Sequence, residues 1–372
     1  MKVLITCLSR SWGGLEMYAI TTMNLLLNKN INAEILCVKG SRIFNESVAN
    51  NFKVHTVDSA GYFNIKAILK TSKILRNGYD IIHSHLSKDL WILVPALKII
   101  SSQTVLCLTK HVGSFIVKKD FLHKRLYNRV NKIFAISTVI KKNLVDTCPV
   151  NESKVELLLN GIDVRKFDPI KSDKNKIRKE YNIGDELLIG MMARFTPGKG
   201  HEEFINAAEV VSKRYPEIKF LIVGEPSKNE EEYTNQIKKM VADKKLNRKI
   251  IFTGFRKDTN DVLVSLDIFV FPSHAEAFGL ALIEAMAMET ATICSNSDGI
   301  LDIAIDNETS LYFQNKNAED LACKMEHLIG SPVKRKELAE KGRKRVLEKF
   351  TSDIHTSLLI NHYNKMLEKS FN

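Results

Sequence analysis

The feature that most constrains this chain is an alternation of short apolar runs with helix-length segments, which occurs twice along the sequence. The first half contains seven runs typical of buried strands, at 3–8, 33–38, 54–57, 80–84, 104–108, 132–135 and 155–158. Six further runs follow at 187–192, 220–223, 250–253, 268–271, 290–294 and 311–313. Because strands that alternate with helices pair in parallel through crossover connections, the pattern predicts two doubly wound α/β halves.

The length of the chain supports this division. Its 372 residues exceed what one ordinary core accommodates and are enough for two domains of similar size. We expect an N-terminal domain over 1–165 and a C-terminal domain over 166–350. The segment 164–185 is polar and lacks an apolar period, which predicts a linker. Residues 351–372 are predicted to form a final helix.

The net charge of +12 comes entirely from the first half. Residues 1–165 carry 23 Lys and Arg against 11 Asp and Glu, so the remainder is neutral. The densest basic stretch, 118–132, contains Phe121, Leu122, Leu126 and Val130 at near-helical spacing. This spacing predicts either an amphipathic helix on an anionic membrane or a core helix with a solvated charged face. We favour the membrane interpretation because the whole half shares the basic bias.

The compartment can also be predicted. No apolar run approaches the roughly 18 residues of a membrane-spanning helix, and no secretory leader is recognisable. The six cysteines stand singly, without a CxxC spacing, as expected of reduced core residues. We therefore expect a cytoplasmic protein, peripheral at the inner face of the plasma membrane if the basic half binds lipid.

Candidate ligand-binding residues follow the strands, because doubly wound sheets bind ligands beyond the carboxyl ends of their strands. Gly13 and Gly14, after the first run, would let a backbone approach a ligand closely, although a plain tight turn explains them equally well. The loop is not GxGxxG and no acidic residue follows about 20 positions on, which disfavours a nicotinamide cofactor.

Two loops of the second half contain charged residues in a suggestive arrangement. Arg194 and Lys199 place two cations at a helix start, which suits a diphosphate, although loop cations are often simply solvated. A helix predicted to begin near Gly279 would offer free backbone NH groups to a phosphate, with Glu276 just before it. Glu284 lies inside the apolar part of that helix and needs a partner, such as vicinal ribose hydroxyls. Capping or solvation is the alternative for either carboxylate.

The segment from Glu276 to Glu284, with Phe278-Gly279-Leu280 between, resembles the signature of family 4 glycosyltransferases, the retaining enzymes of the GT-B fold. The resemblance covers nearly the whole chain. It also includes the Gly13-Gly14 loop, Asn160-Gly161-Ile162-Asp163 with Phe167, Arg194 with Lys199, Gly224-Glu225, and Gly254-Phe255. It implies two Rossmann-like domains facing across a cleft, with the last helix crossing back to the N-terminal domain.

The resemblance implies a role for each matching residue. Arg194 and Lys199 would neutralise the donor diphosphate, and Gly279 and Leu280, next to Phe278, would offer it backbone NH groups. Glu276 would contact the transferred sugar and Glu284 the ribose. The backbone near Phe255 and Arg256 would contact the base of the donor. His111 would be the active-site histidine. Gly14, in the Gly13-Gly14 loop, would approach the phosphate and sugar of the donor.

Neither a metal nor another cofactor is expected. The sequence contains no Asp-x-Asp, and the charge of Arg194 and Lys199 can replace that of a metal ion. His83 and His85 stand one strand period apart, but no third ligand is evident, so we assign them to the acceptor side. Asp302 stands where the family usually has a glutamate, which leaves the identity of the donor sugar open.

The predicted function is retaining transfer of a hexosyl unit from a UDP- or GDP-sugar. The acceptor would be a saccharide or lipid-linked molecule of bacterial polysaccharide or lipopolysaccharide synthesis. The resemblance implies that the acceptor hydroxyl attacks on the face from which the diphosphate leaves. A GT-B epimerase or phosphorylase is the alternative enzyme. A basic nucleic-acid-binding protein is the alternative outside enzymes, although no nucleic-acid-binding motif is present.

Overall fold

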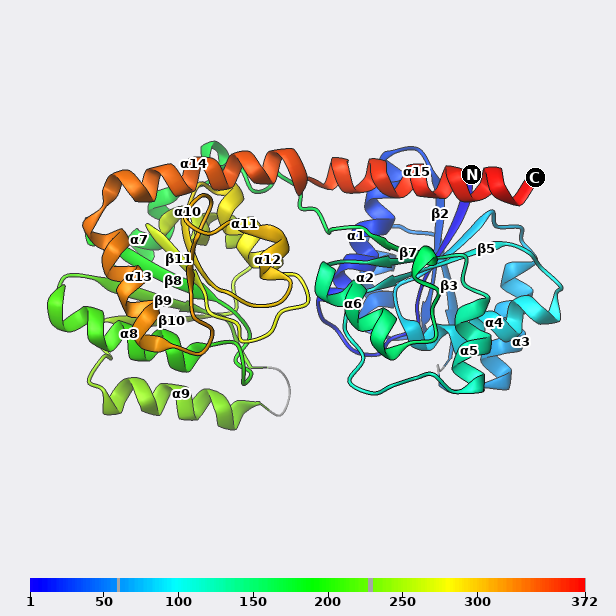
Figure 1. Ribbon diagram of the computed structural model, residues 1–372, viewed down its shortest axis with the longest axis horizontal. Coiled ribbons are helices and arrows are strands. Elements are labelled where there is room, and N and C mark those ends of the chain that lie inside the picture. The colour runs from blue at the N-terminus through cyan, green and yellow to red at the C-terminus, as the bar shows by residue number, and fades with distance from the viewer. Residues whose placement is uncertain (59–60, 227–229, 372) are drawn as a thin grey trace. The chain divides into compact units, whose positions relative to one another are not determined.

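The structure is a computed structural model that describes residues 1–58, 61–226 and 230–371. By internal contacts the chain divides into unit 1, Met1–Leu159 with Ser352–Asn372, and unit 2, Asn160–Thr351. Each unit is a parallel sheet with helices on its faces (Figure 1). The two units are described separately below.

Unit 1 contains a seven-stranded sheet in the order β3-β2-β1-β4-β5-β6-β7. All neighbouring strands pair in parallel, so the carboxyl ends lie at one edge. The strand order reverses between β1 and β4, which is where doubly wound sheets bind ligands. Its elements are β1 (Lys2–Cys7), α1 (Gly14–Asn28), β2 (Asn32–Val38), α2 (Arg42–Ala49), β3 (Val54–Val57), α3 (Ile65–Leu75), β4 (Ile81–Ser84), η1 (Ser87–Asp89), α4 (Leu90–Ile99), β5 (Val105–Lys110), α5 (Phe121–Asn128), β6 (Lys132–Ala135), α6 (Thr138–Thr147), η2 (Glu152–Lys154), β7 (Val155–Leu157) and α15 (Ser352–Phe371).

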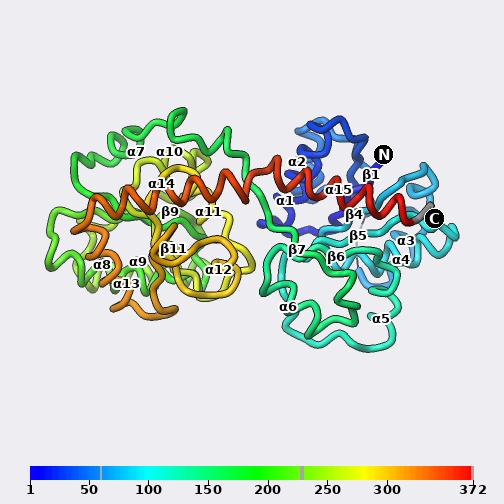
Figure 2. Tube along the Cα trace, turned by 45° about the horizontal axis from the view of Figure 1, so that its top comes forward, coloured from blue at the N-terminus to red at the C-terminus, as the bar shows by residue number. Residues whose placement is uncertain are grey.

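The final helix α15 belongs to unit 1 although it follows unit 2 in the chain. It packs against α1 and β5 (Figure 2). Leu359 and Tyr363 are its deepest residues and join the core of unit 1. The fold of unit 1 is therefore completed by residues that lie about 200 positions beyond its last strand in the sequence.

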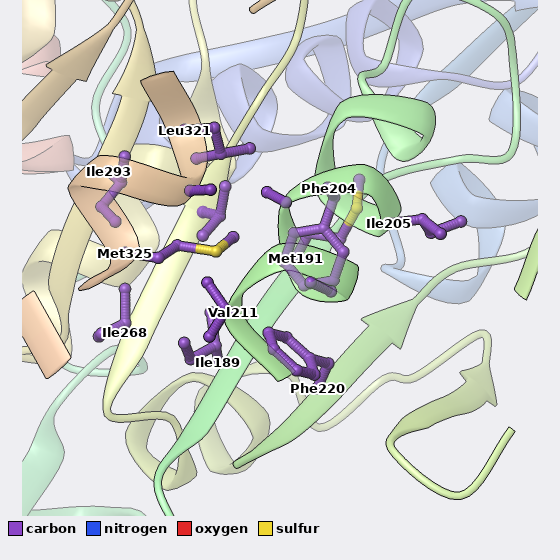
Figure 3. Close-up of a cluster of buried hydrophobic side chains, with 14 of the residues drawn as sticks. Ile189, Met191, Phe204, Ile205, Val211, Phe220, Ile268, Ile293, Leu321 and Met325 are labelled. Carbon is purple, nitrogen blue, oxygen red and sulfur yellow. The ribbon is translucent and has the colours of Figure 1, made fainter. Parts of the chain in front are cut away.

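Unit 2 contains a six-stranded parallel sheet in the order β10-β9-β8-β11-β12-β13, with the reversal between β8 and β11. Its main core packs strand residues such as Ile189, Phe220 and Ile293 against Phe204 of α8 and Met325 of α13 (Figure 3). The elements are η3 (Pro169–Lys171), α7 (Lys174–Glu180), β8 (Leu188–Met192), α8 (His201–Arg214), β9 (Lys219–Val223), α9 (Glu231–Asp243), β10 (Ile250–Gly254), α10 (Thr259–Ser265), β11 (Ile268–Phe271), α11 (Leu280–Ala287), β12 (Ala291–Ser295), α12 (Ile300–Ile303), β13 (Leu311–Phe313), α13 (Ala318–Gly330) and α14 (Pro332–Lys349).

The prediction that 164–185 is a linker is wrong. It contains η3 and α7, and both belong to unit 2. The nitrogen Nζ of Lys176 lies 2.6 Å from Asp258 and 2.8 Å from Asp261, which attaches α7 to the start of α10. A polar segment without an apolar period can form a helix when ion pairs and one buried residue, here Ile177, hold it to its neighbour.

The helix expected in the basic stretch is α5, and the membrane interpretation of its exposed side remains a prediction. Leu126 and Val130 are buried in the core of unit 1, as the core-helix interpretation requires. Phe121 and Leu122 are instead 72% and 46% exposed. The helix α5 has eight residues, Phe121–Asn128. Within the described part of the chain, no helix combines the length and the apolar character that crossing a membrane requires.

Candidate functional site

Three loops at the carboxyl edge of the unit 2 sheet are bonded to one another. The backbone NH of His274, after β11, donates to the carbonyl of Gly198, after β8, at 2.9 Å. The NH of Gly299, after β12, donates to the carbonyl of Glu276 at 3.0 Å. Gly200 has a φ of +78°, and a Cβ added there would lie 2.2 Å from the carbonyl oxygen of Pro272. Only glycine therefore allows this close approach of the first two loops.

Lys199 and Glu276 form an ion pair at this edge. The Nζ of Lys199 lies 2.6 Å from Oε2 of Glu276, and both side chains are partly buried. The sequence predicted both as donor-site residues from two separate loops, and the structure brings them together. Partial burial strengthens such a pair relative to one in bulk water. The pair holds a cation and a carboxylate side by side at the carboxyl end of the sheet.

The helix α11 begins at Leu280, directly after the loop that carries Glu276. Its N-cap is Gly279 with a φ of +115°, a left-handed conformation that favours glycine. The first backbone NH groups of a helix have no partner within it and carry partial positive charge. Phe278 is 2% exposed and packs against Phe350, so its side chain belongs to the core and its backbone is left for the predicted contact.

Glu284 lies in the second turn of α11 and remains partly exposed. Desolvation raises the pKa of its carboxyl to about 7, and the nearby Lys166 offsets only part of this rise. A group with such a pKa is partly ionised at neutral pH and costs the fold stability when charged. Perturbed carboxyls of this kind are more common at functional sites than elsewhere.

The other residues predicted in unit 2 lie on separate loops. Arg194 is exposed after β8, and Phe255 is 60% exposed after β10. The guanidinium of Arg256 bonds Asp258 and Glu180, and this positions the loop rather than leaving the side chain for a ligand. Asp302 lies in the short helix α12. The predicted backbone contact near Phe255 and Arg256 remains compatible with these positions.

In unit 1, the predicted histidines gather at the ends of β4 and β5. The Nδ1 of His85 lies 3.0 Å from Nε2 of His111, and the rings of His83, His85 and His111 stack in sequence. His83 is bonded to Thr109 and Tyr363 rather than facing solvent. Both His83 and His85 are buried, and their assignment to the acceptor side remains a prediction.

Besides Thr109 and Tyr363, sequence analysis missed Tyr18 and His355, which adjoin this histidine cluster. Tyr18 of α1 contacts both His111 and His355, with ring centroids 5.6 and 5.5 Å apart, and His355 comes from α15. No local signal could have identified His355, because its proximity depends on the docking of α15. Burial lowers the pKa of both His83 and His111 to about 3, so both are neutral at physiological pH. His111 therefore supplies no positive charge to this part of the molecule.

The Gly13-Gly14 loop leads into α1, with Gly13 as its N-cap. Glu16, in the first turn, is buried and accepts a hydrogen bond from Oγ of Ser9 at 2.6 Å. This bond fixes the loop beside the reversal point of the sheet. In the described part of the chain, no three His, Cys, Asp or Glu side chains are grouped so that they could hold a metal ion.

Comparison with known families matches both halves of the chain. Residues 12–166 match the model described as Glycosyltransferase Family 4, and residues 173–345 match Glycosyl transferases group 1. A capsular polysaccharide biosynthesis glycosyltransferase, CapM of Staphylococcus aureus, is 30% identical over 248 residues. That match covers 64% of this chain and 62% of the relative. An α-1,3-N-acetylgalactosaminyltransferase of Campylobacter jejuni, named for a diphospho-undecaprenol acceptor, is 25% identical over 82% of each chain.

Solved structures share the fold of the entire chain. A glycosyltransferase from Rickettsia africae has a TM-score of 0.90 at 23% identity, and the match covers 98% of each chain. The Anabaena protein HepE, solved in complex with UDP, has a TM-score of 0.86 at 17% identity, covering 98% of this chain and all of HepE. These likenesses show the GT-B fold, which has two parallel-sheet domains. With both halves matched, the chain belongs to the family 4, group 1 glycosyltransferases of the GT-B fold.

Proposed function

We propose that the protein is a retaining glycosyltransferase that transfers a hexosyl unit from a nucleoside-diphosphate sugar. The observation that carries this proposal is the arrangement in unit 2 of Lys199, Glu276 and the N-terminus of α11. Cationic side chains and free helix NH groups recognise phosphate, while a carboxylate recognises sugar hydroxyls. All three features lie on loops that are bonded to one another, so the site is largely preformed.

The donor would bind with its diphosphate at Arg194, Lys199 and the first NH groups of α11. Glu284 would accept hydrogen bonds from the ribose, and the backbone at Phe255 would meet the base. A uracil base is the first choice, because HepE is described in complex with UDP and an Escherichia coli relative is named for UDP-Gal. A GDP-sugar is the second choice from the sequence.

The chemistry we propose needs no metal ion, because the cations of the site stabilise the leaving diphosphate. The bond between the anomeric carbon and the phosphate oxygen breaks, and the acceptor oxygen bonds to the same face of that carbon. The acceptor's proton passes to the departing phosphate oxygen. The roles of Gly13, Gly14 and His111 of unit 1 in this step remain predictions.

A lipid-linked saccharide is the acceptor class that the relatives favour. The Campylobacter jejuni and Escherichia coli relatives are both named for diphospho-undecaprenol acceptors, and CapM is named for capsular polysaccharide. The match covers 62% of CapM, and it covers 41% of a second Staphylococcus aureus relative, a poly(ribitol-phosphate) α-N-acetylglucosaminyltransferase. A role in cell-envelope polysaccharide or lipopolysaccharide synthesis is therefore part of the proposal.

Thermal shift with UDP-, GDP-, ADP- and CMP-linked sugars tests donor binding without an acceptor, since a ligand stabilises the folded state by mass action. We expect stabilisation by one nucleotide class, undiminished by EDTA. Lys199→Met should weaken the affinity roughly 10- to 100-fold, the value of a charge-assisted contact. Lys239→Met, which removes an exposed cation paired with Asp243 in α9, is the matched control and should bind as the wild type does.

Glu276→Gln separates the sugar from the nucleotide. We expect it to lower turnover of the UDP-sugar more than it lowers UDP affinity, because the contact with the transferred sugar is lost while the glutamine still offers Nζ of Lys199 an acceptor oxygen. NMR of the product's anomeric configuration tests retention. Turnover of the nucleotide sugar without an acceptor would instead indicate an epimerase. Turnover that depends on phosphate would indicate a phosphorylase. A salt-dependent shift of DNA without donor binding would indicate a nucleic-acid-binding protein.

A further inference from the structure

The segment between β5 and α5 exposes more large apolar side chains than the fold requires. Phe115, Ile116 and Val117 are 99%, 66% and 69% exposed, and Phe121 and Leu122 follow at the start of α5. We call residues 112–122 the apolar loop. Single exposed apolar residues are normal on soluble proteins, but a contiguous group usually marks an interaction surface.

The base of the apolar loop is fixed to the rest of unit 1. The backbone NH of Ser114 donates to Oδ1 of Asn143 at 2.6 Å, and Nδ2 of Asn143 donates back to the carbonyl of Ser114 at 3.0 Å. The NH of Lys118 donates to the carbonyl of Thr147 at 2.6 Å. Both ends of the tip are therefore bonded to α6, and residues 115–117 are held outward by the fold.

A second apolar group lies nearby, at the start of α3. Tyr62, Phe63, Ile65 and Leu69 are 49–70% exposed. The ring of Trp91 in α4 lies between the second group and α5, because its centroid lies 5.3 Å from Tyr62, 4.6 Å from Phe63 and 5.3 Å from His123, the residue that follows the apolar loop. The second group and the start of α5 therefore adjoin one aromatic cluster.

The charge around these residues identifies the kind of partner. Residues 112–125 contain four Lys and Arg against one Asp, and residues 61–70 contain two Lys and no acidic residue. Lys119, Lys124 and Arg125 are exposed. Apolar side chains surrounded by basic ones suit an anionic lipid surface, where the rings enter the acyl boundary and the cations meet the headgroups.

We propose that the apolar loop, with the residues at the start of α3, inserts unit 1 into the surface of an anionic lipid bilayer. The inference goes beyond the transfer reaction and rests on the proposed lipid-linked acceptor only for its biological purpose. Insertion would place unit 1 at the surface where such an acceptor resides. The surface involves none of the donor-site residues of unit 2.

Vesicle flotation of the full chain is the test. We expect the wild type to float with phosphatidylglycerol vesicles at low salt and to remain unbound with phosphatidylcholine vesicles. The double variant Phe115→Ser/Ile116→Ser should lose tenfold or more in partitioning. Ile170→Ser, at a residue of unit 2 that is 91% exposed, is the control and should float as the wild type does.

A second variant tests the charge separately and guards against misfolding. Lys119→Gln/Lys124→Gln should lower partitioning into the vesicles by on the order of fivefold per lysine. The remaining partitioning should depend less on the salt concentration than that of the wild type. Donor-induced thermal stabilisation, measured on every variant, should be unchanged, which separates failure here from failure of the proposed function. Absence of wild-type flotation, or equal flotation of the serine variant, would overturn the proposal. A self-association that sedimentation detects and the serine variant abolishes would assign the surface to a second copy instead.

Discussion

Replacing Glu284 with glutamine should stabilise the ligand-free protein while weakening donor binding. Desolvation raises the pKa of the carboxyl from 4.5 to about 7. A shift of that size corresponds to roughly 3 kcal/mol at pH above 7. Because Glu284 remains partly exposed, solvent screens part of this cost, and we expect a gain of about 1 to 2 kcal/mol for Glu284→Gln.

The sign follows from proton binding in the two states. Below pH 4.5 the carboxyl is protonated in both states, so it has no pH-dependent effect on stability. Between pH 4.5 and about 7 the unfolded chain releases a proton that the folded chain retains, and the folded state loses stability as the pH rises. The penalty is complete above about pH 7. The variant's advantage should therefore be absent near pH 4.5 and largest at pH 8.

Differential scanning calorimetry at both pH values is the assay. For a unit of this size, 1 to 2 kcal/mol corresponds to a rise of roughly 2 to 8 °C in the Tm of unit 2. Glu348→Gln, at an exposed position of α14, is the control and should shift the Tm little at either pH. The variant should also lose affinity for the nucleotide donor. A Glu284→Gln variant that is no more stable at pH 8 than at pH 4.5 would refute the reasoning.

Two further predictions concern the close approach of the unit 2 loops and the histidines of unit 1. Gly200→Ala should lower the Tm of unit 2 by about 5 to 15 °C and abolish donor-induced stabilisation, because the new Cβ meets a backbone carbonyl at a positive φ. Gly330→Ala, where an added Cβ meets no atom within 4 Å, is its calorimetric control. Unit 1 should lose stability as the pH falls below about 6.5, because burial holds the pKa of His83 and His111 at about 3 and only the unfolded chain takes up these protons. Burial raises the pKa of Asp89 to about 7, so this single group stabilises unit 1 as the pH falls and offsets only part of the histidine effect. The measurement is hydrogen exchange of unit 1, corrected for the intrinsic pH dependence of exchange. Exchange that slows on acidification would contradict the predicted loss of stability.

The sequence by itself predicted the strands and the loops that carry the proposed donor site. Buried parallel strands are apolar on both faces, so each appears as a short uninterrupted run, and every predicted run overlaps a strand in the described part of the chain. Ligand loops follow those strands at the carboxyl edge. The positions of Lys199, Glu276 and Gly279 could therefore be predicted from local order alone.

Contacts between distant segments were decided only by the tertiary structure. The polar helix α7 is attached to α10 by the pairs that Lys176 forms with Asp258 and Asp261 of another segment. Phe278 lies in the core because Phe350 packs against it. His355 joins the histidine cluster only because α15 docks on unit 1. Local sequence patterns indicate which residues are buried. Which residues they contact depends on segments far away in the sequence and is decided only when the whole chain has folded.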